Sequence, residues 1–383
     1  MTDQSNSNPF VHLLLSLVSL ILIVMTAAPV SAQSTAPWWE RIDFGGDFRQ
    51  RFEGFFQDGE ETRQRLRFRL RLTVDAEVND DVAFGLRLGS GDLGDPISTN
   101  QSFTNLLTRK PVGLDRVFIT YTPSGARALT IGGGKFGIPV ARTEMTFDND
   151  LNWEGLWQRV RGVNGPVSYR FVGAQVPLAE SRSADDAILY AGFGEVGFAF
   201  GGHGLHFSVA DYGFQNVDRV AVVLGNAGIG RNSNRYEFDE DGKVIGFVSG
   251  FNLVDVIARA TLETGRENYP VQLTANFVKN TEAAHDDDSG LWLMASYGQA
   301  SQPKSYQLVY TYARIEEDAV LSAFTFSDNP GTNMWMHRTT VSYMIARRVH
   351  LDFTGIFTKK LNVGPNDPNN LLKRTQLDAR ISF

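Results

Sequence analysis

The sequence predicts an all-β protein: a transmembrane antiparallel β-barrel of about 16 strands. Segments of alternating polar and apolar residues recur from residue 42 to the end of the chain. The connections between these segments are short and long in turn. Beyond the N-terminal region, no apolar run approaches the roughly 18 residues of a membrane-spanning helix. If the chain enters a membrane, it must do so as a closed barrel, because only helices and barrels satisfy their backbone there.

Composition sets the first limits on function. The chain has 383 residues, no cysteine and a net charge of −7. The absence of cysteine excludes disulfides and cysteine-based metal sites. The mild acidity argues against nucleic-acid binding, which needs a basic surface. The 37 glycines and 27 phenylalanines suit strands, turns and aromatic belts better than helices.

The N-terminus predicts export. An apolar run from Leu13 to Ala28 is followed by Val30-Ser31-Ala32, a small-x-small pattern typical of signal-peptide cleavage. The preceding segment has no lysine or arginine, which departs from the usual signal peptide. An uncleaved membrane helix is the alternative, but the run is shorter than the ~20 residues that cross a bilayer. We therefore expect residues 1–32 to be a signal peptide and residues 33–383 to form the barrel domain.

The first predicted strand, residues 42–53, has Asp47 and Arg49 on its polar face. The second strand carries the strongest signal. Its sequence, RQRLRFRLRLTVDAEV (63–78), alternates arginines with apolar residues. On a helix these arginines would point in all directions, whereas on a strand they share one face. The arginines of this face are Arg63, Arg65, Arg67, Arg69 and Arg71.

Energetics place these arginines inside the barrel. A lipid-facing arginine costs roughly 2–4 kcal/mol at the bilayer midplane. Several on one strand would exceed a typical folding stability of about 5–15 kcal/mol. The arginine face must therefore line a water-filled lumen, and we expect acids such as Asp47 on the first strand to lie beside it. We expect the hairpin to close with Glu53 near Arg63.

Fourteen further segments have strand character. They are residues 82–89, 116–122, 128–136, 155–162, 167–176, 187–200, 204–214, 251–263, 271–280, 290–298, 306–316, 335–345, 349–359 and 374–383. Links after even strands are short and links after odd strands are long, as in outer-membrane barrels. The long segment 215–250 has room for an extra hairpin.

The last strand, RTQLDARISF, ends in Phe383. This ending resembles that of bacterial outer-membrane porins. The segments FGGDFRQRFE, RQRLRFRLRLTVDAEVNDDVAFGLRLGSG and GGGKFGIPVARTEMTFDNDLNWEG are similar to the putative porin family of Gram-negative bacteria. From about residue 40 onward, the resemblance implies a 16-stranded porin in outer-membrane lipid. It also implies that Phe383 is recognised by the barrel-assembly machinery, and it suggests a homotrimer.

The resemblance further implies that the third long connection folds inward as a constriction loop. Residues 138–154 hold apolar anchors, which need burial, and four acids: Glu144, Asp148, Asp150 and Glu154. We expect these acids to face Arg67, Arg69 and Arg71 across the pore. The alternative is a loop packed over the rim. Wall arginines favour anions and the acidic loop opposes them, so we expect a passive channel for ions and small polar solutes with a weak anion preference.

Other motifs give weaker evidence of function. GSGDLG (89–94) matches a dinucleotide fingerprint, but no helix pattern follows it. DEDG (239–242) and DDD (286–288) lack the spacing of a calcium loop, and we expect neither a cofactor nor a metal. An outer-membrane barrel enzyme is one alternative, although no local hydrolase signature marks a nucleophile. A secreted or surface-binding β-protein without a channel is the other, but it would leave a very large apolar surface exposed.

Overall fold

The computed structural model describes residues 37–103, 106–181, 185–227, 231–329, 331–365 and 367–383. The predicted signal peptide lies outside these residues and stays a prediction. The described chain begins with a short 3-10 helix, η1 (Trp38–Arg41), that leads into the first strand.

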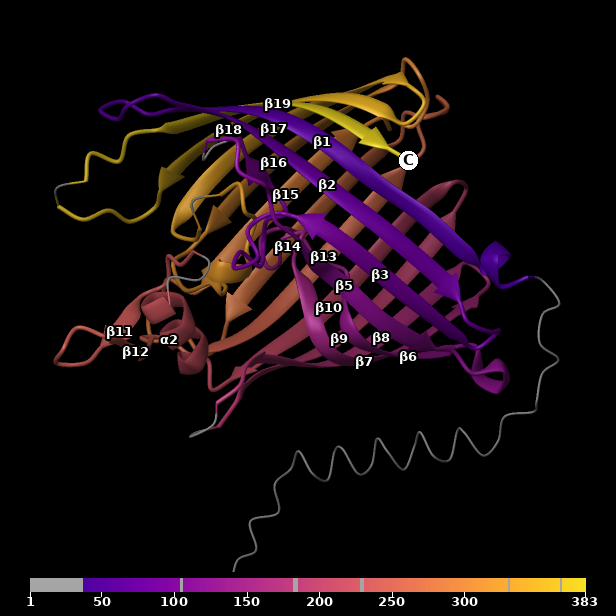
Figure 1. The fold of residues 1–383 in the computed structure, drawn as a ribbon, viewed down its shortest axis with the longest axis horizontal. Helices are drawn as coiled ribbons and strands as arrows, with labels where there is room; N and C mark the ends of the chain where they lie inside the picture. Colours follow the sequence, from indigo (N-terminus) through magenta and orange to yellow (C-terminus); the bar gives the residue numbers. More distant parts are fainter. Residues whose placement is uncertain (1–36, 104–105, 182–184, 228–230, 330, 366) are drawn as a thin grey trace, which may run out of the picture.

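The wall is one antiparallel sheet that closes on itself (Figure 1). Its long strands are β1 (Ile42–Phe56), β2 (Arg63–Glu77), β3 (Val82–Ser90), β5 (Val112–Tyr121), β6 (Leu129–Gly137), β7 (Asn152–Asn164), β8 (Val167–Ala179), β9 (Ala187–Phe200), β10 (His203–Gln215), β13 (Phe251–Leu262), β14 (Val271–Asn280), β15 (Ser289–Tyr297), β16 (Tyr306–Ile315), β17 (Met334–Ala346), β18 (Val349–Lys360) and β19 (Leu372–Ser382). The two-residue strand β4 (Gln101–Ser102) adds to the edge of β2. The fold is therefore the predicted 16-stranded barrel.

Closure joins the first strand of the barrel to the last. β1 pairs with β2 on one side and with β19 on the other, so Asp47 lies opposite both Arg71 and Ser382. The backbone groups of Phe383 and Gly46 exchange two hydrogen bonds of 3.0 Å. The C-terminal residue thus seals the barrel against its first strand.

The two faces of the wall are opposite in character to those of a soluble protein. On the outer face, Leu66, Phe171 and Phe353 are 46%, 57% and 55% exposed. On the inner face, Arg69 and Asp378 are 9% and 5% exposed. A protein in water buries its large apolar side chains and exposes its charges. An apolar outer band with buried charges inside is what a barrel in lipid requires.

Short and long connections lie at opposite rims of the barrel, as the sequence predicts. Short links join β2 to β3, β7 to β8, β9 to β10 and β17 to β18 at one rim, and the long links lie at the other. The longest, between β10 and β13, contains the helix α2 (Asp218–Ala227) and the hairpin β11 (Tyr236–Phe238) and β12 (Val244–Phe247). Figure 1 shows these three elements together at the left end of the barrel, away from the start of β1. The extra hairpin in residues 215–250 is confirmed.

Two details differ from the sequence prediction. β1 continues to Phe56, so Glu53 lies opposite Arg65 and not beside Arg63. β7 begins at Asn152, three residues before the predicted start, and this changes the direction of Glu154. Of the helices that the structure describes, none is long and apolar enough to cross a membrane.

Candidate channel constriction

The connection from β6 to β7, residues 138–151, folds into the barrel, and we call it the first inner loop. Its apolar side chains anchor it to the wall formed by β10 and its neighbours. Phe147 packs edge-on against Trp153 and Tyr212, with ring centroids 5.3 and 5.0 Å apart. Thr146 Oγ1 donates to Asp255 Oδ2 on β13 at 2.6 Å. The loop is thus fixed to the wall that faces the arginine row across the lumen.

One acid of this loop reaches the arginine row. Asp150 Oδ1 accepts a hydrogen bond of 3.1 Å from Arg71 and lies 3.7 Å from Arg69. Its other oxygen accepts from Thr99 Oγ1 at 2.8 Å. Burial raises the pKa of Asp150, but the charges of Arg69 and Arg71 outweigh it and the pKa is lowered. Asp150 is therefore a fixed negative charge inside the lumen.

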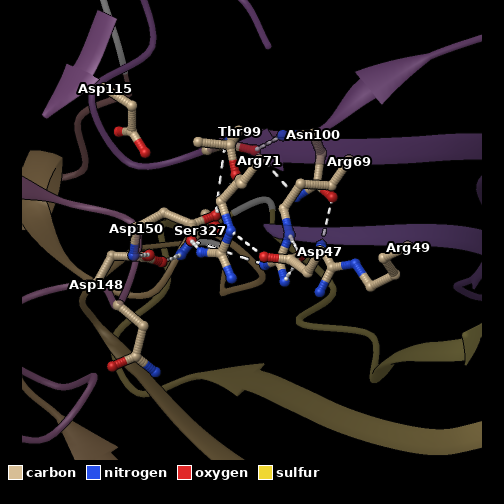
Figure 2. Close-up of polar contacts among 12 residues, drawn as sticks. Asp47, Arg49, Arg69, Arg71, Thr99, Asn100, Asp115, Asp148, Asp150 and Ser327 are labelled. Atoms are coloured by element: carbon tan, nitrogen blue, oxygen red, sulfur yellow. Dashed lines mark hydrogen bonds and ion pairs between the residues drawn. The ribbon is translucent and has the colours of Figure 1, made fainter. Parts of the chain in front are cut away.

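Asp47 completes the cluster from the wall. Its carboxylate accepts from Arg69 at 2.7 Å and from Arg71 at 2.6 Å. Figure 2 shows Arg71 between the carboxylates of Asp47 and Asp150. Two guanidinium groups and two carboxylates therefore form one charge-balanced cluster where the first inner loop meets the wall.

Asp148 and Glu144 lie elsewhere than predicted. Asp148 accepts backbone hydrogen bonds of 2.6 Å from both Asp150 N and Ser327 N, and contacts none of the wall arginines. Burial, together with the nearby charge of Asp150, raises the pKa of Asp148 to about 8. Glu144 pairs with Arg338 on β17 at 2.6 Å. These two acids join the loop to other parts of the interior.

Glu154 corrects the sequence prediction. It lies in β7, where it shares the outer face with Leu156, which is 40% exposed. Its carboxylate pairs with Lys135 of β6 at 2.5 Å and is largely exposed. Because neighbouring residues of a strand point to opposite faces, Glu154 points away from the lumen that holds Trp153. It is not part of the constriction.

The remaining predicted residues follow the inner face of β1 and β2. Arg65 pairs with Glu53, and Arg67 lies 3.8 Å from the same carboxylate. Arg49 bonds to Asn100 and lies 3.9 Å from Asp378. Arg63 sits at the exposed end of the row, with its guanidinium 5.8 Å from the ring centroid of Phe55. The row thus extends from the constriction to the rim.

Sequence reasoning missed a second inward loop, residues 316–329 between β16 and β17, which we call the second inner loop. Its residues Val320 and Leu321 are buried, and Asp328 lies between Arg51 and Arg374 at 2.9 and 2.6 Å. The signal was present: apolar residues inside a long acidic connection, the criterion that identified the first inner loop.

Two cavities remain among these loops and the wall. One, of about 300 Å³, is lined by Asp47, Arg69, Arg71 and Arg87 on the side of the short turns. The other, of about 410 Å³, lies toward the long loops and is lined by Asp92, Asp95, Asp115 and α2. Arg87 and Asp115 form an ion pair, so this pair stands between the two cavities. Charged groups of both signs therefore lie between the two cavities.

No group of His, Cys, Asp or Glu side chains within the described ranges is arranged to hold a metal ion.

Residues 55–223 match a protein family described as putative porin. Over these residues, which are less than half of the chain, the protein is similar to the putative porin family. The family match and the fold together support an outer-membrane channel. Among curated proteins, none matches the sequence.

Solved structures share the fold at low sequence identity. OprB of Pseudomonas putida is 14% identical with a TM-score of 0.61, over 90% of this chain and 94% of that one. OmpF of Salmonella typhi, in complex with daunomycin, is 8% identical with a TM-score of 0.51, over 89% and 97%. OmpT of Vibrio cholerae, in a trimer form, is 10% identical with a TM-score of 0.50, over 92% and 100%. These likenesses concern the fold alone.

Proposed function

We propose that the protein is a passive outer-membrane channel for ions and small polar solutes, with a weak preference for anions. The observation that supports this proposal is the charged interior. Asp150, on a loop anchored across the lumen, faces Arg69 and Arg71 on the wall. Such opposed fixed charges select among small ions by their sign and size. The wall residues Asp47, Arg49, Arg63, Arg65 and Arg67 would line the same path.

The anion preference rests on arginines that lack a carboxylate partner. Arg159 donates to Thr130 Oγ1 at 3.3 Å, and Arg259 donates to the backbone oxygen of Arg142 at 2.8 Å. Arg142 itself bonds to the backbone of Asp148 and to the amide of Asn149. Within the described residues, these three arginines have only neutral acceptors. Because their charge is not neutralised by a direct ion pair, it would raise the local concentration of small anions.

Location and assembly belong to the same proposal. Residues 1–32 would direct export and be removed, and residues 33–383 would insert into outer-membrane lipid. The side chain of Phe383 is 51% exposed at the seam of the barrel, where the assembly machinery could reach it. OmpT has a trimer form, and we propose a homotrimer here as well.

Planar-bilayer recording of residues 33–383 under a salt gradient tests the function. Discrete current steps with a reversal potential on the anion side would support it. Correctly inserted, heat-modifiable barrels that give no current steps would refute the channel. Steps with a cation-side reversal potential would refute only the anion preference.

A further inference from the structure

The second inner loop contacts strands that are not its neighbours in the sheet. It leaves β16 after Ile315 and returns to the wall at Met334 of β17. In sheet order, β17 is separated from β1 by β18 and β19. The loop nevertheless reaches β1 and β19 through the side chain of Asp328. It therefore spans a sector of the lumen and does not simply cover the rim.

Asp328 holds the loop to the wall. Its Oδ2 accepts from Arg51 of β1 at 2.9 Å, and its Oδ1 accepts from Arg374 of β19 at 2.6 Å. Arg374 also donates to the backbone oxygen of Asp328. The two arginines have further partners on the wall, Asp378 and Glu53. Although burial raises the pKa of Asp328, Arg374 and Arg51 lower it well below its usual value, so the carboxylate stays charged.

Backbone contacts join the second inner loop to the first. Asp148 N donates to Phe324 O at 2.7 Å, and Phe326 N donates to Glu144 O at 3.0 Å. Ser327 N donates to the carboxylate of Asp148 at 2.6 Å (Figure 2). The Arg338 guanidinium stacks 4.5 Å from the ring centroid of Phe326. The two loops thus form one layer across the barrel, anchored by Asp328 at its far end.

A third segment holds this layer on the side of the long loops. The side chain of Asn234 donates to the backbone oxygens of Glu317 and Val320 at 2.7 and 3.0 Å. Its Oδ1 accepts from Ser322 N at 2.8 Å. Hydrogen bonds inside the barrel therefore hold together loop segments that are far apart in the sequence. Asp328 is the contact that ties the second inner loop to β1 and β19.

We propose that Asp328 is a positioning residue that keeps the second inner loop inside the lumen as a second constriction element. The loop closes the sector beside β17, β18, β19 and β1, and it leaves solutes the route past Arg71 and Arg87. This inference rests on the proposed channel function. Loss of the Asp328 carboxylate removes the ion pairs that tie this end of the loop to β1 and β19, and it also leaves Arg51 and Arg374 with less negative charge. Conductance and anion selectivity should therefore rise together.

Single-channel recording in planar bilayers tests this with Asp328→Asn, Asp328→Glu and a matched control, Asp367→Asn. Asp367 also pairs with a cation, Lys360 at 2.6 Å, but it lies in the exposed connection between β18 and β19. Asp328→Asn should increase the conductance and raise the anion-to-cation permeability ratio above the wild-type values, because it removes one negative charge from the interior. Asp328→Glu should stay close to the wild type, and Asp367→Asn should change neither quantity.

A loop-shortened protein, with residues 319–329 replaced by Gly-Gly-Ser, covers the case in which Asp328→Asn does not fold. Its barrel should insert, remain heat-modifiable and conduct more current than the wild type. Equal conductance of folded wild-type and loop-shortened barrels would overturn the inference and leave the channel function standing. If neither conducts, the proposed function itself fails.

Discussion

Asp150 provides the sharpest test of the constriction. The change Asp150→Asn keeps the size of the side chain and removes one negative charge beside Arg71, at 3.1 Å. Arg69 and Arg71 keep their contacts with Asp47, so the wall should remain folded. The substitution therefore changes the charge of the lumen with little change in its shape.

The magnitude follows from this geometry. An anion at hydrogen-bond distance from Arg71, ~3 Å away, would lie roughly 6 Å from the Asp150 carboxylate. Two unit charges at that distance in water interact by about 0.7 kcal/mol. Removing this repulsion raises anion occupancy about 3-fold. The anion-to-cation permeability ratio should increase by a similar factor.

The assay is the reversal potential of single channels under a salt gradient, measured for wild type, Asp150→Asn and Glu154→Gln. Glu154 lies only four residues further along the chain, but its carboxylate pairs with Lys135 on the outer face. The control should keep the wild-type reversal potential. An unchanged potential in Asp150→Asn, or an equal shift in the control, would refute the location of the constriction.

Three further predictions concern titration, packing and lipid exposure. Because the pKa of Asp148 is raised to about 8, the stability contributed by its neutral form is present at low pH and is lost as pH rises from about 4 to 8. Asp148 gains a negative charge between pH 7 and 9, so the reversal potential should move toward cations over that range. Asp148→Asn should abolish that shift. Phe147→Ala removes the ring packed between Trp153 and Tyr212, so the unfolding free energy in urea titrations should fall by about 3–5 kcal/mol and channel noise should increase; an unchanged unfolding midpoint would contradict the packing. Leu70→Arg places a charge on the outer face of β2 and should lower folding stability in lipid vesicles by roughly 2–4 kcal/mol; a neutral effect would argue against lipid contact there.

The strands could be predicted because alternation is a local signal. β2, β9 and β14 lie within one residue of the segments expected from the sequence. A barrel wall separates lipid from an aqueous interior along its whole length, so the residues of each strand alternate between apolar and polar. The lengths of the connections then give the rim to which each link belongs. Little long-range information is needed for either inference.

The interior depends on contacts that sequence spacing does not encode. The register of Glu53 with Arg65 follows from where the β1–β2 turn begins, and the prediction placed it two residues away. Glu154 was assigned to the loop because the start of β7 was placed too late. The pairing of Asp328 with Arg51 joins residues 277 positions apart, and nothing local indicates it. Of the four loop acids expected opposite the wall arginines, Asp150 is the one whose carboxylate contacts Arg69 and Arg71.

The most direct test of the account is the single-channel current of residues 33–383 in a planar bilayer under a salt gradient. We expect discrete current steps and a reversal potential weakly on the anion side, because Arg142, Arg159 and Arg259 have no carboxylate of the described residues within ion-pair distance. Silent bilayers from barrels that are demonstrably folded and inserted would contradict it.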